Sequence, residues 1–180
     1  MRAIILLVGL LALQACDRQK PEDQQGVPAA PSATSRVGID RSRAGTPAPA
    51  IEFTDPDGES TSLAAFSGRP MLVNLWATWC APCVKELPTL DDLSDRPGAP
   101  QVLALSQDMA PQDKVAAFLN ERQVGLEPFH DKTMAMSSAL GASILPVTVL
   151  YDSNGREIWR FTGDLDWTGE QAAALLREAR

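Results

Sequence analysis

The stretch WATWCAPCVKELP, residues 76–88, contains two of the chain's three cysteines, Cys80 and Cys83, separated by two residues. It follows a nearly continuous apolar run, MLVNLWAT, and leads into a segment with helical character. A cysteine pair with this spacing could exchange disulfides, bind a metal ion or close a structural cross-link. The residues around the pair and the rest of the chain distinguish these possibilities.

The apolar run at residues 71–78 predicts a strand that is buried on both faces of a parallel sheet. The segment 84–93 predicts a helix that Pro88 interrupts and kinks. The cysteine pair therefore lies at a strand-to-helix junction. Free backbone N–H groups and the positive end of the helix dipole favour an anion there, which lowers the pKa of the Cys80 thiol.

The order of residues in the motif suits disulfide exchange. Cys80 would attack a disulfide as the thiolate, and Cys83, one turn deeper on the same side of the helix, would resolve the mixed disulfide. Pro82 fits the first helical turn, where its missing N–H would have had no partner.

Three other uses of the cysteine pair fit the sequence less well. A closed zinc site needs four ligands, and the single histidine, His130, is distant. Covalent haem attachment needs a histidine directly after the second cysteine, where Val84 stands. A purely structural disulfide across so small a loop would add little stability. The sequence therefore predicts a redox-active disulfide with no metal and no other cofactor.

The remaining sequence predicts an α/β domain. The order of its elements indicates a central mixed sheet with helices on both sides. These elements are a strand and turn at 51–61, a buried strand at 101–106, helices at 111–123 and 131–142, a hairpin at 147–161 and a final amphipathic helix at 167–180.

The first sixteen residues, MRAIILLVGLLALQAC, predict export from the cytoplasm. The apolar run from Ala3 to Leu13 is shorter than the roughly 20 residues that a membrane-spanning helix needs, and it suits a signal peptide. The ending LQAC resembles a bacterial lipobox, which predicts a lipoprotein-type signal peptide at 1–15 and lipid attachment at Cys16. An uncleaved anchor and simple secretion are the alternatives.

Residues 16–46 predict a flexible tether, because they hold no aromatic residue and are rich in Pro, Ser, Ala, Gly and Gln. Asp17 resembles the signal that retains lipoproteins in the inner membrane, so we expect the folded domain, residues 47–180, to face the periplasm. The net charge of -7 argues against a nucleic-acid partner.

The W-x-x-W-C-x-P-C-x-x-E-x-P pattern and the segment LPVTVLYDSNGREIWRFTGDLDW resemble the thioredoxin superfamily, and more closely its membrane-anchored TlpA/ResA/DsbE-type thiol–disulfide oxidoreductases. The resemblance implies a thioredoxin-like fold with an added N-terminal β-hairpin. It also implies a reductant of client proteins, in cytochrome c maturation or copper-site assembly, which a membrane electron donor regenerates.

The resemblance assigns roles to particular residues. Pro146 matches the family's cis-proline, and it leaves the backbone of Leu145 free to pair with a client chain beside Cys80. Trp79 and Pro82 would line the same client-binding surface.

The acid of the site is expected on the helix. Ordinary thioredoxins carry an aspartate where this chain has Asn74, whereas Glu86 matches the acid of ResA-like proteins. We expect Glu86, with its pKa raised by burial, to accept the proton that Cys83 loses.

Two other functions of the same fold are alternatives. Peroxiredoxins use a cysteine in a T-x-x-C context, but Thr78 is only two residues before Cys80. Copper metallochaperones of this fold use C-x-x-x-C with a distant histidine, and the present cysteines are one residue too close together.

Overall fold

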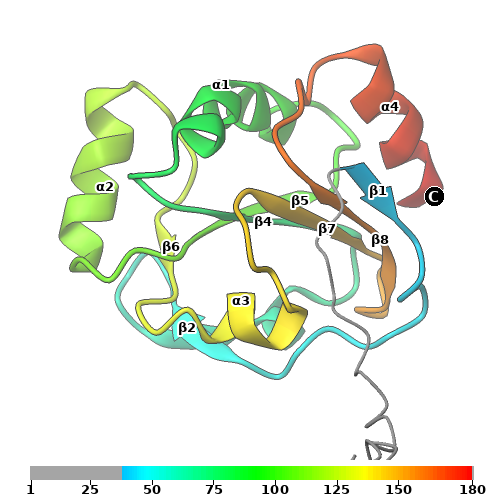
Figure 1. Cartoon of the computed structure of the whole chain (residues 1–180), viewed down its shortest axis with the longest axis horizontal. Coiled ribbons are helices and arrows are strands. Elements are labelled where there is room, and N and C mark those ends of the chain that lie inside the picture. The colour runs from blue at the N-terminus through cyan, green and yellow to red at the C-terminus, as the bar shows by residue number, and fades with distance from the viewer. Residues whose placement is uncertain (1–37, 180) are drawn as a thin grey trace, which may run out of the picture. The chain divides into compact units, whose positions relative to one another are not determined.

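The computed structural model describes residues 38–179, in which one mixed sheet lies between helices (Figure 1). The strand order is β1-β8-β7-β4-β5-β6-β2-β3. The strands are β1 (Gly38–Asp40), β2 (Glu52–Thr54), β3 (Ser60–Ser62), β4 (Met71–Trp76), β5 (Gln101–Ser106), β6 (Phe129–His130), β7 (Val147–Tyr151) and β8 (Glu157–Thr162). This arrangement confirms the predicted α/β class and the central mixed sheet.

Strand β4 occupies the centre of the sheet, as its apolar sequence predicts. All six of its residues are buried, and it pairs in parallel with β5 and antiparallel with β7. A strand with neighbours on both edges and helices over both faces has no contact with water, so a nearly continuous apolar run is the sequence that suits it.

Helices cover both faces of the sheet (Figure 1). Buried side chains of α1 (Ala81–Ser94), α2 (Gln112–Glu121) and α4 (Glu170–Leu176) share one apolar cluster with Leu72 and Trp76 of β4 and Leu150 of β7. Helix α3 (Ala135–Leu140) packs with the opposite residues of these strands, as do Phe53 of β2 and Leu63 of the short 3-10 helix Leu63–Phe66. A second 3-10 helix, Arg177–Ala179, follows α4.

The two predicted hairpins are present, and aspartates hold their turns. Between β2 and β3, the Asp55 carboxylate accepts hydrogen bonds from the backbone N–H groups of Asp57 and Glu59 at 3.0 and 2.9 Å. Between β7 and β8, Asp152 accepts from the backbone of Asn154 and Arg156, both at 2.8 Å. These are the local turn contacts that aspartate favours.

The predicted tether at 16–46 is wrong for its last part. Gly38–Asp40 forms β1, which pairs antiparallel with β8. Gly45 N donates to the carbonyl of Glu157 at 2.7 Å, and Glu157 N donates to that of Thr46 at 2.9 Å. Backbone groups make these contacts, and backbone pairing leaves no signature in composition. Cys16, the signal peptide at 1–15 and the rest of the tether lie outside the described residues.

Helix α1 continues through Pro88 to Ser94, so the proline does not end the helix. Leu87 before it and Leu90 and Leu93 after it are buried in the same cluster, and this packing favours the helix on both sides of the proline. Across residues 38–179, none of the helices has the length and apolar character needed to cross a membrane.

Candidate active site

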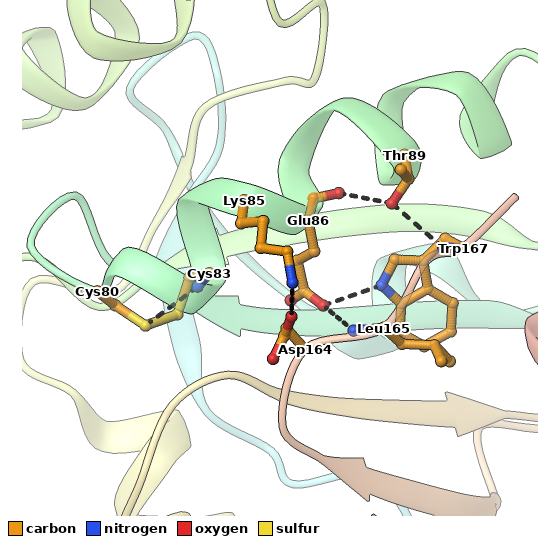
Figure 2. A network of polar contacts seen from close by, with 8 residues as sticks. All are labelled: Cys80, Cys83, Lys85, Glu86, Thr89, Asp164, Leu165 and Trp167. Atoms are coloured by element: carbon orange, nitrogen blue, oxygen red, sulfur yellow. Dashed lines mark hydrogen bonds and ion pairs between the residues drawn. A yellow bond between two sulfur atoms is a disulfide. The ribbon is translucent and has the colours of Figure 1, made fainter.

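Cys80 and Cys83 form a disulfide at the N-terminus of α1 (Figure 2). Cys80 is the N-cap residue of the helix, and its Sγ accepts a hydrogen bond from the backbone N–H of Cys83 at 3.4 Å. Cys80 is 6% exposed, whereas Cys83 is fully buried. Because Cys80 is the more exposed of the two cysteines and its Sγ faces a helical N–H group, it has the surroundings of an attacking thiolate.

The loop that carries Cys80 is attached to the neighbouring strand. The carboxylate of Asp108 accepts from the backbone N–H of Thr78 at 2.9 Å and from its hydroxyl at 2.6 Å. The Ser106 hydroxyl donates to the same carboxylate at 2.8 Å, and His130 Nε2 lies 2.8 Å from the Asp108 carbonyl oxygen. His130 is buried, which agrees with a packing role.

The strand register places Pro146 beside the cysteine loop. Leu75 of β4 pairs with Val147 of β7, so Pro146 lies next to the point where β4 ends. The Leu145–Pro146 peptide bond is cis, as the resemblance implies. The Pro146 carbonyl accepts from Gly163 N at 3.0 Å, which connects the proline to the segment after β8.

Glu86 lies behind the disulfide and is only 2% exposed. Its Oε1 accepts from Asn74 Nδ2 at 2.7 Å. Its Oε2 accepts from Leu165 N and Trp167 Nε1, both at 3.1 Å (Figure 2). Burial raises the pKa of Glu86 to about 7, although the three hydrogen bonds partly oppose the rise. A carboxyl with this pKa takes up and releases a proton near neutral pH.

Helix α1 also holds the segment after β8 on either side of Glu86. Lys85 Nζ forms an exposed ion pair with Asp164 at 2.8 Å, and Thr89 Oγ1 accepts from Trp167 N at 3.2 Å (Figure 2). Lys85 faces solvent, whereas Glu86, the next residue, points into the core.

The two tryptophans of the motif have opposite environments. Trp76 is fully buried, in agreement with core packing, and Trp79 is 66% exposed. Pro82 is exposed as well, so the motif presents an open surface next to Cys80.

A comparison with protein families matches the Redoxin model to residues 43–176. The chain belongs to the Redoxin family. The thiol–disulfide oxidoreductase ResA of Bacillus thuringiensis (strain Al Hakam) is 28% identical over 135 residues, which cover 74% of this chain and 77% of that relative. Given this relative and its CxxC disulfide, this redoxin is a thiol–disulfide oxidoreductase similar to ResA.

Two solved structures illustrate its thioredoxin-like fold. A protein assigned as the thiol:disulfide interchange protein DsbE of Chlorobium tepidum has a TM-score of 0.65 and 23% identity, covering 76% of this chain and 98% of that one. The exposed lipoprotein thioredoxin Etrx1 of Streptococcus pneumoniae strain TIGR4 has a TM-score of 0.55 and 23% identity, covering 71% and 96%.

Most of the predicted site residues of this redoxin gather around one end of β4. The cysteine loop with Trp79, Cys80 and Pro82 follows that end of the strand, and Pro146 lies beside it. Sequence reasoning missed Asp108 and Trp167. Asp108 had a usable signal, because it closely follows β5 and the carboxyl ends of the parallel strands β4 and β5 meet at one edge of the sheet. The sequence offers no comparable signal for Trp167, because this residue is 81 positions from Glu86.

Proposed function

We propose that this chain reduces disulfides of client proteins outside the cytoplasm, tethered to the inner membrane through Cys16. The main support for this reaction is the disulfide at the N-terminus of α1, with the buried acid Glu86 one helical turn after Cys83. The signal-like residues 1–16 support the location, as does the similarity to a pneumococcal lipoprotein thioredoxin.

The proposed reaction transfers two electrons to the client. The Cys80 thiolate attacks one sulfur of the client disulfide, forms a mixed disulfide and releases the other client sulfur as a thiolate. The Cys83 thiol transfers its proton to Glu86, and the resulting thiolate attacks Cys80 Sγ. The bond to the client breaks, its second sulfur leaves as a thiolate and the Cys80–Cys83 disulfide forms. The two client thiolates become thiols by taking up one proton from Glu86 and one from water. A thiol-reducing membrane protein then returns two electrons to this disulfide.

Binding of the client is proposed for the surface around Cys80. Trp79 and Pro82 are exposed beside the sulfur, and Leu145 is half-buried next to Pro146. Because Pro146 has no N–H, it donates no hydrogen bond that would compete with backbone pairing between Leu145 and the client. The clients we expect are apocytochromes c before haem attachment or proteins with cysteine ligands of copper.

The experiment is to trap the client in cells. Cys83→Ala leaves Cys80 able to attack but prevents resolution, so mixed disulfides should accumulate and can be identified by mass spectrometry. The double variant Cys80→Ala/Cys83→Ala should capture nothing. Alkylation of the wild-type chain in intact cells should find Cys80 and Cys83 mainly as thiols. A predominantly oxidised pair, or no protein captured by Cys83→Ala, would contradict the proposal.

A further inference from the structure

The two oxygens of Glu86 have different surroundings. Oε2 faces two N–H donors, the backbone of Leu165 and the indole of Trp167, and neither can accept a hydrogen bond from a protonated carboxyl. Oε1 faces one donor, the side-chain amide of Asn74 at 2.7 Å. A proton on Oε2 would disrupt two hydrogen bonds, so Oε1 is the oxygen that takes the proton.

Of the three described groups that donate to the Glu86 carboxylate, the Asn74 amide is the one that can also accept a hydrogen bond. Its Nδ2 donates to Glu86 Oε1 and also to Thr148 Oγ1 at 2.9 Å. Its Oδ1 is buried and has no hydrogen-bond partner among residues 38–179. Buried polar atoms are almost always paired, so an unpaired amide oxygen in a fully buried side chain requires a reason.

We propose that the Asn74 amide turns by a half-rotation each time Glu86 gains or loses its proton. The inference rests on the proposed function, in which that proton comes from Cys83. With Glu86 ionised, Nδ2 donates to Glu86 and Thr148, as in the structure. With Glu86 protonated, Oδ1 takes the place of Nδ2 and accepts from the Glu86 carboxyl O–H and from the Thr148 hydroxyl, which can donate as well as accept.

The two orientations of the Asn74 amide make the same number of hydrogen bonds. Each makes two hydrogen bonds through one atom of Asn74 and leaves the other atom of the amide unpaired. A fixed donor would favour the ionised form of Glu86 alone, whereas an amide that rotates supports both forms. An aspartate at this position would instead place a second carboxyl against Glu86, and two carboxyls in contact resist ionising together.

Few other ionisable groups among the described residues influence the protonation of Glu86. On the segment after β8, Asp164 raises the pKa of Glu86, and it is itself paired with Lys85 of α1 at the surface. On the same face of α1 lies Cys83, which titrates only in the reduced protein. The sheet presents the neutral side chains of Asn74 and Thr148.

The test follows Asn74 and Glu86 by NMR in the oxidised full-length protein, in which neither Cys80 nor Cys83 titrates. The carboxyl 13C signal of Glu86 and the side-chain amide signals of Asn74 are recorded from about pH 5 to about pH 9, on either side of the raised pKa. Both sets of signals should move with one midpoint. Nuclear Overhauser contacts from the Asn74 amide protons to Thr148 should be present at high pH and lost at low pH.

Two variants serve as controls. In Glu86→Gln the Asn74 signals should not respond to pH. In Thr89→Val, which removes the hydroxyl contacts to Trp167 N and to the Glu86 backbone carbonyl but none to the Glu86 carboxylate, they should respond as in the wild type. Contacts from the amide to Thr148 that persist over the whole pH range would overturn the rotation. That result would leave the exchange reaction untouched, because the measurement involves no client and no thiol.

Asn74→Leu provides a second test. If the amide rotates, its loss removes one hydrogen bond from each form of Glu86, and the midpoint of the Glu86 signal should stay within about half a unit of the wild-type value. If Asn74 is only a donor to the carboxylate, the midpoint should rise by about one to two units. A rise of that size would contradict the proposal.

Discussion

At the scale of single residues, the environment of Glu86 decides its chemistry. An exposed glutamate is ionised at neutral pH, but burial raises the pKa of Glu86 from 4.5 to about 7. The hydrogen bonds from the backbone N–H of Leu165 and the indole N–H of Trp167 keep the shift from being larger, because they stabilise the carboxylate. The residue is therefore held near the midpoint of its titration, where it can both accept and return a proton.

This raised pKa predicts how the stability of the protein depends on pH. The folded state keeps the proton of Glu86 up to about pH 7, whereas the unfolded chain releases it near pH 4.5. The unfolded state therefore binds fewer protons in this window, so Glu86 lowers the free energy of unfolding as the pH rises, by about 3 kcal/mol in total.

The variant Glu86→Gln should not show this decrease in the free energy of unfolding as the pH rises. Urea denaturation of the oxidised protein at about pH 5 and about pH 8 measures the difference between wild type and variant at each pH. Glu121→Gln, at the exposed end of α2, controls for the removal of one carboxylate. A difference between wild type and Glu86→Gln that is the same at both pH values would contradict the assignment.

At the scale of elements, a buried ion pair joins the β7–β8 hairpin to helix α3. Arg160 donates to both carboxylate oxygens of Glu157, at 2.7 and 2.6 Å, and its third contact is the carbonyl of Leu140 at 2.6 Å. Leu140 is the last residue of α3, so the guanidinium satisfies a carbonyl that the helix leaves open. The Glu157 and Arg160 side chains are 2% and 11% exposed.

We predict that Arg160→Met lowers the free energy of unfolding by about 3–5 kcal/mol, because it leaves the Glu157 carboxylate buried without its partner. The double variant Glu157→Met/Arg160→Met removes both charges and should recover a large part of that loss. Urea denaturation of the wild type, both single variants and the double variant measures the coupling. Additive effects of the two single changes would show that the pair is not coupled.

At the scale of the whole molecule, the folded domain includes residues 38–46, which precede the segment that the sequence predicts to be folded. Strand β1 and residues 41–46 lie along the outer edge of β8, and Arg41 forms an exposed ion pair with Glu178 near the end of the chain. The exposed pair contributes little stability on its own, but the backbone pairing covers the outer edge of β8, which would otherwise be unpaired.

Two truncated chains test this contribution. A chain that begins at Gly38 keeps β1, and one that begins at Pro47 lacks it. The shorter chain should be less stable by at least about 2 kcal/mol, because it loses the ladder to β8 and the hydrogen bonds of residues 45 and 46. The redox potential of Cys80–Cys83, measured in glutathione buffers, should be the same in both. Equal stability would show that β1 is dispensable.

The amino-acid sequence is enough to predict the α/β class, the buried central strand, both hairpin turns and the cysteine pair at the start of α1. These features depend on residues that are close together in the chain, where periodicity, turn chemistry and helix-terminal geometry act. Glu86 and Pro146 were predicted as well, but through resemblance to a family rather than from local physics.

The tertiary structure alone decided the pairing of β1 with β8, the attachment of Thr78 to Asp108 and the partners of Glu86. Each depends on groups that are far apart in sequence, such as Glu86 and Trp167, which are separated by 81 residues. Burial and hydrogen bonding set the charge state of a carboxyl, and both arise only when distant segments pack around it. That is why the sequence could name the acid while its proton affinity had to come from the folded chain.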